Sequence, residues 1–247
     1  MTGDAWFPLA PGTGETLVFC FPFAGGSATF YRPWIAPASA AGLAVLPVEL
    51  PGRGLRRQEA PQRDLPMLIE ALGPALRDRL DRRFILFGHS LGALLAFETA
   101  RHLRRRYALT PAALVVSGRY PPHRRGNPDR FRHALPPPRF LAALKELGGT
   151  TPEILAHPDL MALAEPPLRA DFALTELYAH VEEAALDCPI LALTGEADAE
   201  VSVAEMAEWS RHAAAGFELV TMPGDHFYLR DRTPEMVAHL TRCAAPA

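Results

Sequence analysis

The hydrophobic pattern of the chain alternates between two kinds of segment. Six short runs are continuously apolar, which is typical of strands in a parallel sheet that is covered on both faces. These runs span residues 16–21, 43–50, 84–88, 113–118, 189–195 and 217–222. Longer segments lie between them, and two of these, 66–82 and 91–106, place apolar side chains on one helical face. The alternation predicts an α/β fold with one mostly parallel, doubly wound sheet.

One interval is much longer than the others. Residues 119–187 separate the fourth run from the fifth, and a single crossover needs far fewer residues. The interval opens with a segment rich in Pro and Arg and continues with helical patterns at 138–147, 151–156, 158–163 and 165–182. We expect a single domain over residues 1–247, in which an insertion at approximately 120–185 forms a helical lid. The alternative is a helical excursion that only covers the core.

Composition and charge exclude several classes of protein. The chain has 247 residues and a formal net charge of −3, which does not favour nucleic-acid binding. Its three cysteines, Cys20, Cys188 and Cys243, fit neither a disulfide framework nor a zinc site, and we expect buried free thiols at the first two. The N-terminus lacks the features of a signal peptide, and no apolar run approaches the ~18 residues of a membrane span. We therefore predict a cytoplasmic protein.

The candidate chemistry centres on the segment Gly88-His89-Ser90-Leu91-Gly92. Gly-x-Ser-x-Gly between a strand and a helix is the pattern of a nucleophile elbow, in which a tight turn exposes the serine hydroxyl at the carboxyl edge of the sheet. The following helix directs its N-terminal N–H groups at that edge, where they would stabilise an oxyanion. The alternative is a glycine-rich turn with an ordinary surface serine.

A serine nucleophile needs a base and an acid, which follow it in the order acid, then histidine. His226 comes directly after the last predicted strand, and the Pro223-Gly224 turn would bring it over the sheet edge. The penultimate strand is followed by Glu196, Asp198 and Glu200. We favour Asp198 over Glu196 because it lies at the tip of the loop.

The second oxyanion donor is expected in the loop after the first strand. Pro22 has no N–H, so the candidates are Phe23, Ala24 and Gly25, and we choose Ala24. The Leu91 N–H is the other donor. The Gly25-Gly26 pair lacks the spacing of a phosphate or dinucleotide loop, so we predict no cofactor, and we predict no metal.

Several blocks of sequence together resemble the type II thioesterases, the stand-alone editing hydrolases of polyketide synthases and nonribosomal peptide synthetases. They are FCFPFAGGSATFYRPW, VELPGRGLRRQE, LFGHSLGALLAFETA, LVVSGRYPP, ELGGTTPEIL, LRADFALTELY and MPGDHFYL, in this order between about residues 16 and 230. Lipases and esterases share the elbow with this family but do not share FPFAGGSA.

The resemblance implies an α/β-hydrolase fold with a helical lid, a triad of Ser90, Asp198 and His226, and oxyanion donors at Ala24 and Leu91. It also implies hydrolysis of aberrant or stalled acyl groups on the phosphopantetheine thiol of acyl or peptidyl carrier proteins, through an acyl-serine. General carboxylesterase or acyltransferase activity is the alternative.

Two further expectations follow from the resemblance. Apolar residues of the insertion would line the acyl channel, namely Leu163, Leu168, Phe172 and Tyr178. Since carrier proteins tend to be acidic, exposed arginines would steer docking, namely Arg56, Arg57, Arg119, Arg124 and Arg125. We expect a monomer.

Overall fold

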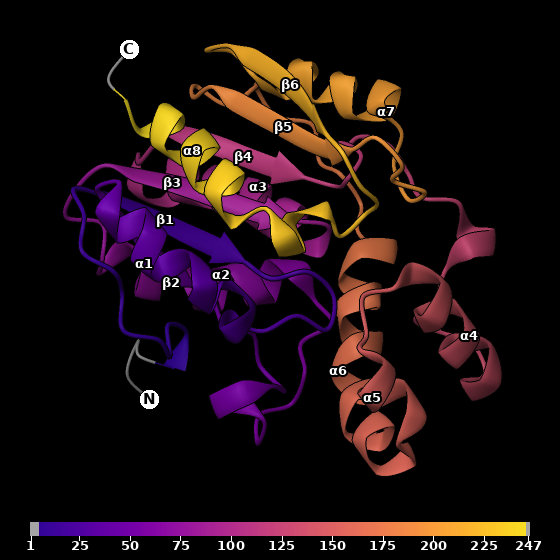
Figure 1. The fold of residues 1–247 in the computed structure, drawn as a ribbon. Helices are drawn as coiled ribbons and strands as arrows, with labels where there is room; N and C mark the ends of the chain where they lie inside the picture. Colours follow the sequence, from indigo (N-terminus) through magenta and orange to yellow (C-terminus); the bar gives the residue numbers. More distant parts are fainter. Residues whose placement is uncertain (1–4, 246–247) are drawn as a thin grey trace.

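The computed structural model describes residues 5–245 and contains one six-stranded sheet, all of whose strand pairs are parallel (Figure 1). The strands are β1 (Thr16–Phe21), β2 (Leu43–Pro47), β3 (Phe84–His89), β4 (Ala113–Ser117), β5 (Ile190–Gly195) and β6 (Phe217–Met222). Their order across the sheet is β2-β1-β3-β4-β5-β6. The predicted α/β fold and all six predicted strands are confirmed.

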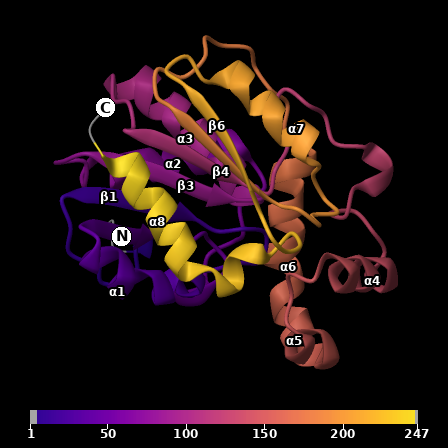
Figure 2. The same ribbon diagram turned by 45° about the horizontal axis from the view of Figure 1, so that its top comes forward.

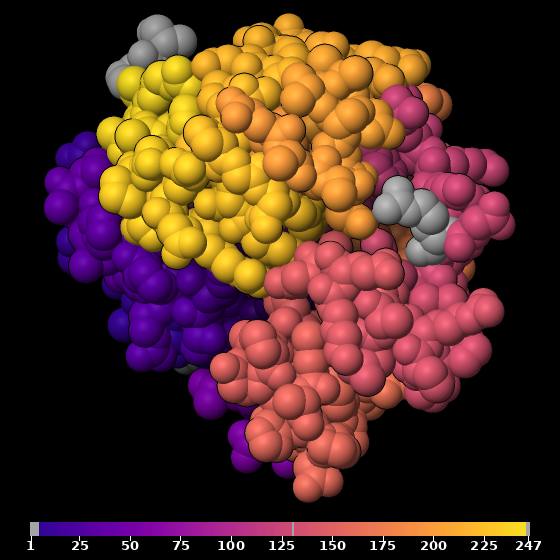
Figure 3. Space-filling model, turned by 45° about the vertical axis from the view of Figure 1, so that its right-hand side comes forward, coloured from indigo at the N-terminus to yellow at the C-terminus, as the bar shows by residue number. Residues whose placement is uncertain are grey.

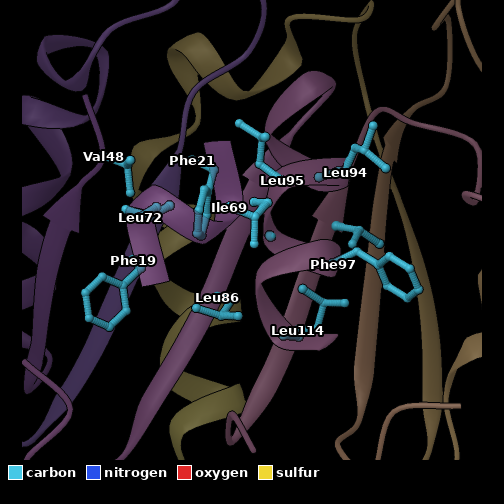
Figure 4. Close-up of a cluster of buried hydrophobic side chains, with 14 of the residues drawn as sticks. Phe19, Phe21, Val48, Ile69, Leu72, Leu86, Leu94, Leu95, Phe97 and Leu114 are labelled. Atoms are coloured by element: carbon cyan, nitrogen blue, oxygen red, sulfur yellow. The ribbon is translucent and has the colours of Figure 1, made fainter. Parts of the chain in front are cut away.

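Helices cover both faces of the sheet, as the continuously apolar strands require. Along β1, Phe19 and Phe21 face one layer of helices, and Val18 and Cys20 face the other. The first layer contains α2 (Leu65–Arg77), α3 (Leu91–Tyr107) and α7 (Val203–Ala207), and part of its core is drawn in Figure 4. The second layer contains α1 (Arg32–Ala40) and α8 (Thr233–Ala244), which lie side by side in Figure 2.

The strand order reverses between β1 and β3. From β1 the chain moves outward to β2, and it then returns to build β3, β4, β5 and β6 on the other side. In open α/β sheets, ligands bind outside the carboxyl ends of the strands at such a reversal. The loop after β1 and the turn after β3 meet at this point, and these are the segments that carry Ala24 and Ser90.

The long interval between β4 and β5 contains a 3₁₀ helix (Pro128–Arg130) and three α-helices: α4 (Pro137–Leu147), α5 (Pro152–Ala156) and α6 (Pro158–Glu176). They lie beyond the carboxyl ends of the strands and form a lobe that projects from the rest of the surface (Figures 1 and 3). The sequence predicts separate helices at 158–163 and 165–182, and this is wrong. A single helix runs through Pro166 and Pro167 and ends at Glu176.

Within residues 5–245, none of the helices is long and apolar enough to cross a bilayer. Cys20 and Cys188 are buried free thiols, as predicted, and burial raises the pKa of both.

Candidate active site

Ser90 lies in a strained turn between β3 and α3. Its backbone adopts φ 55° and ψ −116°, a conformation that non-glycine residues rarely adopt. The Ser90 N–H donates to the Ser117 carbonyl at 2.8 Å, so the neighbouring strand holds the turn in place. This is the geometry expected of a nucleophile elbow.

The two glycines that flank Ser90 are required by close packing. A Cβ atom on Gly88 would lie 1.9 Å from the Gly92 carbonyl oxygen, and a Cβ atom on Gly92 would lie 2.2 Å from the Phe21 carbonyl oxygen. The start of α3 can therefore approach β1 only because these positions carry no side chain. This close approach brings the loop after β1 next to Ser90.

His226 and Asp198 are hydrogen-bonded to each other across the ends of β5 and β6. His226 Nδ1 lies 2.8 Å from Asp198 Oδ2, and the Asp198 side chain is fully buried. The other carboxylate oxygen, Oδ1, accepts the N–H groups of Glu200 at 2.8 Å and Val201 at 3.3 Å. The carboxylate is thus fixed by its own loop and presents one oxygen to the imidazole.

Backbone hydrogen bonds join the loop that carries the acid to the loop that carries the histidine. The Glu196 N–H donates to the Met222 carbonyl at 2.8 Å, and the Ala197 N–H donates to the Gly224 carbonyl at 2.9 Å. Glu196 is itself exposed. Of the acids considered from the sequence, Asp198 is therefore the one that contacts His226.

Ser90, His226, Ala24 and Leu91 line the same cavity, which has a volume of about 310 Å³. The cavity lies under the insertion, whose Leu147 and Phe172 also line it. The sequence therefore identified four residues that the fold brings together, and a fifth, Asp198, that contacts one of them. No cluster of three or more His, Cys, Asp or Glu side chains within residues 5–245 is arranged to hold a metal ion.

An N–H group that already donates a hydrogen bond to the protein is not free to bind an oxyanion, and this narrows the candidate donors. Leu91 is the first residue of α3, so its N–H has no acceptor within the helix. In the loop after β1, the Gly25 N–H donates to Asp171 Oδ2 at 2.8 Å. This removes Gly25 from the three candidates and leaves Phe23 and Ala24.

Asp171 also belongs to a buried ion pair that sequence reasoning missed. Arg53 donates to both carboxylate oxygens at 2.6 Å, and to the Gly26 carbonyl at 3.1 Å. The Asp171 and Arg53 side chains are 1% and 9% exposed. The pair ties α6 of the insertion to the loop that carries Ala24. Asp171 lies in the block LRADFALTELY and Arg53 in the block VELPGRGLRRQE, but nothing in either block indicates that the two residues pair.

His89 forms a second, buried layer beneath His226. The two rings have their centroids 4.8 Å apart, and His89 Nδ1 is 2.9 Å from Ser117 Oγ, which is 2.7 Å from the Tyr228 hydroxyl. Burial, together with nearby His226, lowers the pKa of His89 well below its usual value. His89 is therefore neutral at pH 7, and it adds no positive charge beside His226.

Two of the arginines expected at a docking surface are buried, so that part of the prediction is wrong. Arg56 is 8% exposed because it packs over the Trp6 ring and pairs with Glu59 at 2.6 Å. Arg119 is 8% exposed and lines the cavity. Arg57, Arg124 and Arg125 are exposed.

Of the residues expected to line the acyl channel, only some lie at the cavity or in the cluster next to it. Phe172 lines the cavity, and Leu168 is buried in the same packed cluster of the insertion. Leu163 is 76% exposed because it lies on the outer face of α6. Tyr178 lies beyond the end of α6, where its hydroxyl donates to Glu98 at 2.7 Å and its ring lines a separate groove.

Comparisons with known proteins show the family to which the chain belongs. A family model described as a thioesterase domain matches residues 16–243. The thioesterase PikA5 of Streptomyces venezuelae is 39% identical over 231 residues, which cover 93% of this chain and 81% of that protein. The RedJ thioesterase, from the prodiginine biosynthetic pathway in Streptomyces coelicolor, has a TM-score of 0.86 at 36% identity and covers 97% of this chain and 93% of its own. BorB, a type II thioesterase from the borrelidin biosynthetic cluster, has a TM-score of 0.84 at 34% identity and covers 99% of this chain and 98% of its own.

Proposed function

The chain belongs to the thioesterase domain family, and on this premise we propose that it releases acyl groups from the phosphopantetheine thiol of carrier proteins through an acyl-serine on Ser90. The chain is a thioester hydrolase. The observation that carries the proposed mechanism is the 2.8 Å contact between His226 and the buried Asp198, at a cavity that His226 shares with the strained Ser90.

The proposed reaction has two stages. His226 removes the proton from Ser90 Oγ as the hydroxyl attacks the thioester carbonyl, and Asp198 stabilises the imidazolium that forms. The N–H groups of Ala24 and Leu91 hold the tetrahedral oxyanion. The thiolate leaves with the proton from His226, and a water molecule, activated by the same imidazole, then hydrolyses the acyl-serine to the free acid.

We propose that the biological role is editing of assembly lines. The similar thioesterases RedJ and BorB come from the prodiginine biosynthetic pathway and the borrelidin biosynthetic cluster. By this analogy the chain would act in the cytoplasm as a monomer on acyl or peptidyl carrier domains whose acyl groups have stalled. The insertion would serve as a lid, since α6 carries Phe172 into the cavity beside Ser90.

The test is a panel of acyl groups on phosphopantetheinylated carrier protein, assayed for free acid. We expect hydrolysis by the wild-type chain, and a loss of several orders of magnitude for Ser90→Ala. Simple esters and a second acyl acceptor in parallel reactions separate this function from an esterase or an acyltransferase. Full thioesterase activity in Ser90→Ala would refute the mechanism, and a strong preference for simple esters would refute the substrate class.

A further inference from the structure

Arg119 is a buried cation at the wall of the active-site cavity. It follows Ser117 at the end of β4 by two residues, and it lines the cavity together with Ser90 and His226. The Trp209 indole N–H donates to the Arg119 carbonyl at 2.7 Å and fixes the backbone. The neighbouring Gly118 lies against the catalytic layer, because a Cβ atom there would be 3.2 Å from His226 Cε1. Arg119 is therefore attached to the wall next to the reacting groups.

The guanidinium of Arg119 has no protein partner in the part of the chain that the structure describes. Among the side chains that the structure describes, at 5–129 and 131–245, no ion pair or hydrogen bond reaches it, and its Nε is buried without an acceptor. The guanidinium packs against the Tyr120 ring, whose centroid is 4.9 Å from Arg119 Cζ. By contrast, Arg132 at the same cavity pairs with Glu200 at 2.8 Å.

Glu176, an acidic side chain close enough to influence Arg119, is already engaged elsewhere. Glu176 accepts the backbone N–H groups of Arg132 at 2.7 Å and His133 at 2.9 Å, and contacts the His133 ring at 2.7 Å. It contributes to the electrostatic environment of Arg119 without bonding to it. Burial lowers the pKa of Arg119, yet an arginine side chain stays charged in proteins. Burying a charge without a partner costs free energy of folding. The presence of such a charge in the wall of an active site therefore points to a ligand that pairs with it.

We propose that the Arg119 guanidinium donates hydrogen bonds to a carbonyl or carboxylate oxygen of the thioester substrate. This inference rests on the proposed function and specifies how that site binds its substrate. The oxygen has two chemical sources close to the sulfur. One is the acyl chain, as a 3-oxo or carboxylate group, and the other is the first amide carbonyl of the pantetheine arm.

Binding is measured first, in Ser90→Ala protein so that the ligands are not consumed. The ligands are butyryl-pantetheine and 3-oxobutyryl-pantetheine, and their affinities are measured by calorimetry. Arg119→Met should weaken binding of at least one ligand by about tenfold or more, which is the usual range for a hydrogen bond to a charged group. Arg119→Lys keeps the charge and loses the fork of donors, so it should give an intermediate affinity. It also tests the proposal if Arg119→Met fails to fold.

The two ligands distinguish the two sources of the oxygen. A larger loss for the 3-oxobutyryl ligand identifies the acyl chain, and an equal loss for both identifies the pantetheine arm. The matched control is Arg132→Met, which removes another cation from the same cavity. Unchanged affinity for both ligands in Arg119→Met and Arg119→Lys overturns the proposal, and so does an equal loss in Arg132→Met.

Turnover of p-nitrophenyl butyrate, which has neither oxygen, separates this inference from the proposed function. In protein that retains Ser90, we expect Arg119→Met to lower kcat/KM for at least one of the two pantetheine thioesters by a larger factor than kcat/KM for this ester. A loss of the same size on the ester would assign Arg119 a structural role and overturn the proposal. If the wild-type chain hydrolyses the ester but no pantetheine thioester, the proposed function fails, and the calorimetry still decides whether Arg119 binds the ligand oxygen.

Discussion

The contact between Asp198 and His226 is the residue-scale feature on which the mechanism depends most directly. Asp198→Asn would keep the shape of the side chain but could present an N–H instead of an oxygen to His226 Nδ1. It would also remove the negative charge that stabilises the imidazolium. We expect kcat to fall by about 10⁴-fold, as it does for the corresponding change in another serine hydrolase. Steady-state kinetics on an acyl-pantetheine thioester measure this.

The natural control for that variant is Glu196→Gln on the same loop. Glu196 is exposed, and only its backbone N–H joins the turn of His226, so its kinetics should match the wild-type chain. If Glu196→Gln lost as much activity as Asp198→Asn, the assignment of the acid would be wrong.

At this scale, the residues predicted from the sequence were those whose role depends on local context. Ser90 could be predicted as the nucleophile because strand, turn and helix are adjacent in the chain, and His226 could be predicted as the base because it follows the last strand. Asp171 and Arg53 could not be found in this way. Their pair joins residues 118 positions apart, and its role depends on a backbone N–H that only the folded loop presents. Such long-range partners have no local sequence signal.

At the scale of elements, the pair between Asp171 and Arg53 makes α6 and the loop after β1 act together. Asp171→Asn would weaken the ion pair with Arg53 and the hydrogen bond from the Gly25 N–H. Gly25 is next to the proposed donor Ala24. We expect kcat to fall by about ten- to a hundredfold with a smaller change in KM, because an oxyanion donor acts mainly in the transition state. Steady-state kinetics at 25 °C, with thermal unfolding in parallel, measure both effects.

The variant Glu165→Gln provides the comparison on the same helix. Glu165 pairs with Arg169 at 2.7 Å and has no contact with the loop after β1 among the described contacts. It should leave kcat unchanged. A loss of stability in Asp171→Asn with an unchanged kcat in the folded fraction would show that the ion pair only holds the insertion in place.

The insertion also shows where prediction from sequence fails for elements. The pattern correctly predicted helices in this interval but divided α6 at residue 164, whereas the helix continues through Pro166 and Pro167. Local propensity disfavours proline inside a helix. Buried packing of Leu168, Phe172 and Leu174 and the ion pair of Asp171 stabilise the helix beyond the prolines. Tertiary contacts thus override a local signal, and these contacts cannot be derived from the segment alone.

A second pair of elements, the loop after β4 and the 3₁₀ helix Glu208–His212, should make stability depend on pH. His212 Nε2 is 2.8 Å from His123 Nδ1, and burial together with nearby His123 and His180 lowers the pKa of His212 to about 4. Between pH 6.5 and 4 the unfolded chain binds a proton at His212 that the folded chain does not. The free energy of unfolding should therefore fall as the pH drops through this window, by up to about 3 kcal/mol from this group, and level off below it.

The variant His212→Asn cannot titrate and should remove that contribution. Urea unfolding at pH 7, 6, 5 and 4 should give a shallower decline for His212→Asn than for the wild-type chain. The exposed His157, changed to Asn, should follow the wild-type curve. Parallel curves for His212→Asn and the wild-type chain would contradict the assignment.

At the scale of the whole molecule, the distribution of charge matters more than the net charge of −3. Of the five arginines expected to steer a carrier protein, Arg57, Arg124 and Arg125 are exposed. Arg57 follows β2 and Arg125 follows β4, so both lie at the carboxyl edge of the parallel sheet, and Arg125 lines the cavity that Ser90 shares. A carrier protein that delivers a thioester to Ser90 has to approach this edge.

Long-range attraction acts on the rate of encounter, and salt screens it. The double variant Arg57→Glu/Arg125→Glu should therefore lower kcat/KM for an acidic acyl carrier protein by about tenfold at low ionic strength, and the deficit should shrink in about 0.5 M salt. The same variant should turn over a small acyl-pantetheine, which is not guided by the carrier's charge, with much less change. Arg77→Glu at the end of α2 changes an exposed arginine at the opposite edge of the sheet and should have little effect on either substrate.

An equal loss on carrier and pantetheine substrates in Arg57→Glu/Arg125→Glu, or a loss that salt leaves unchanged, would show that these two arginines act on the cavity itself. The carboxyl edge would then not be an electrostatic docking surface.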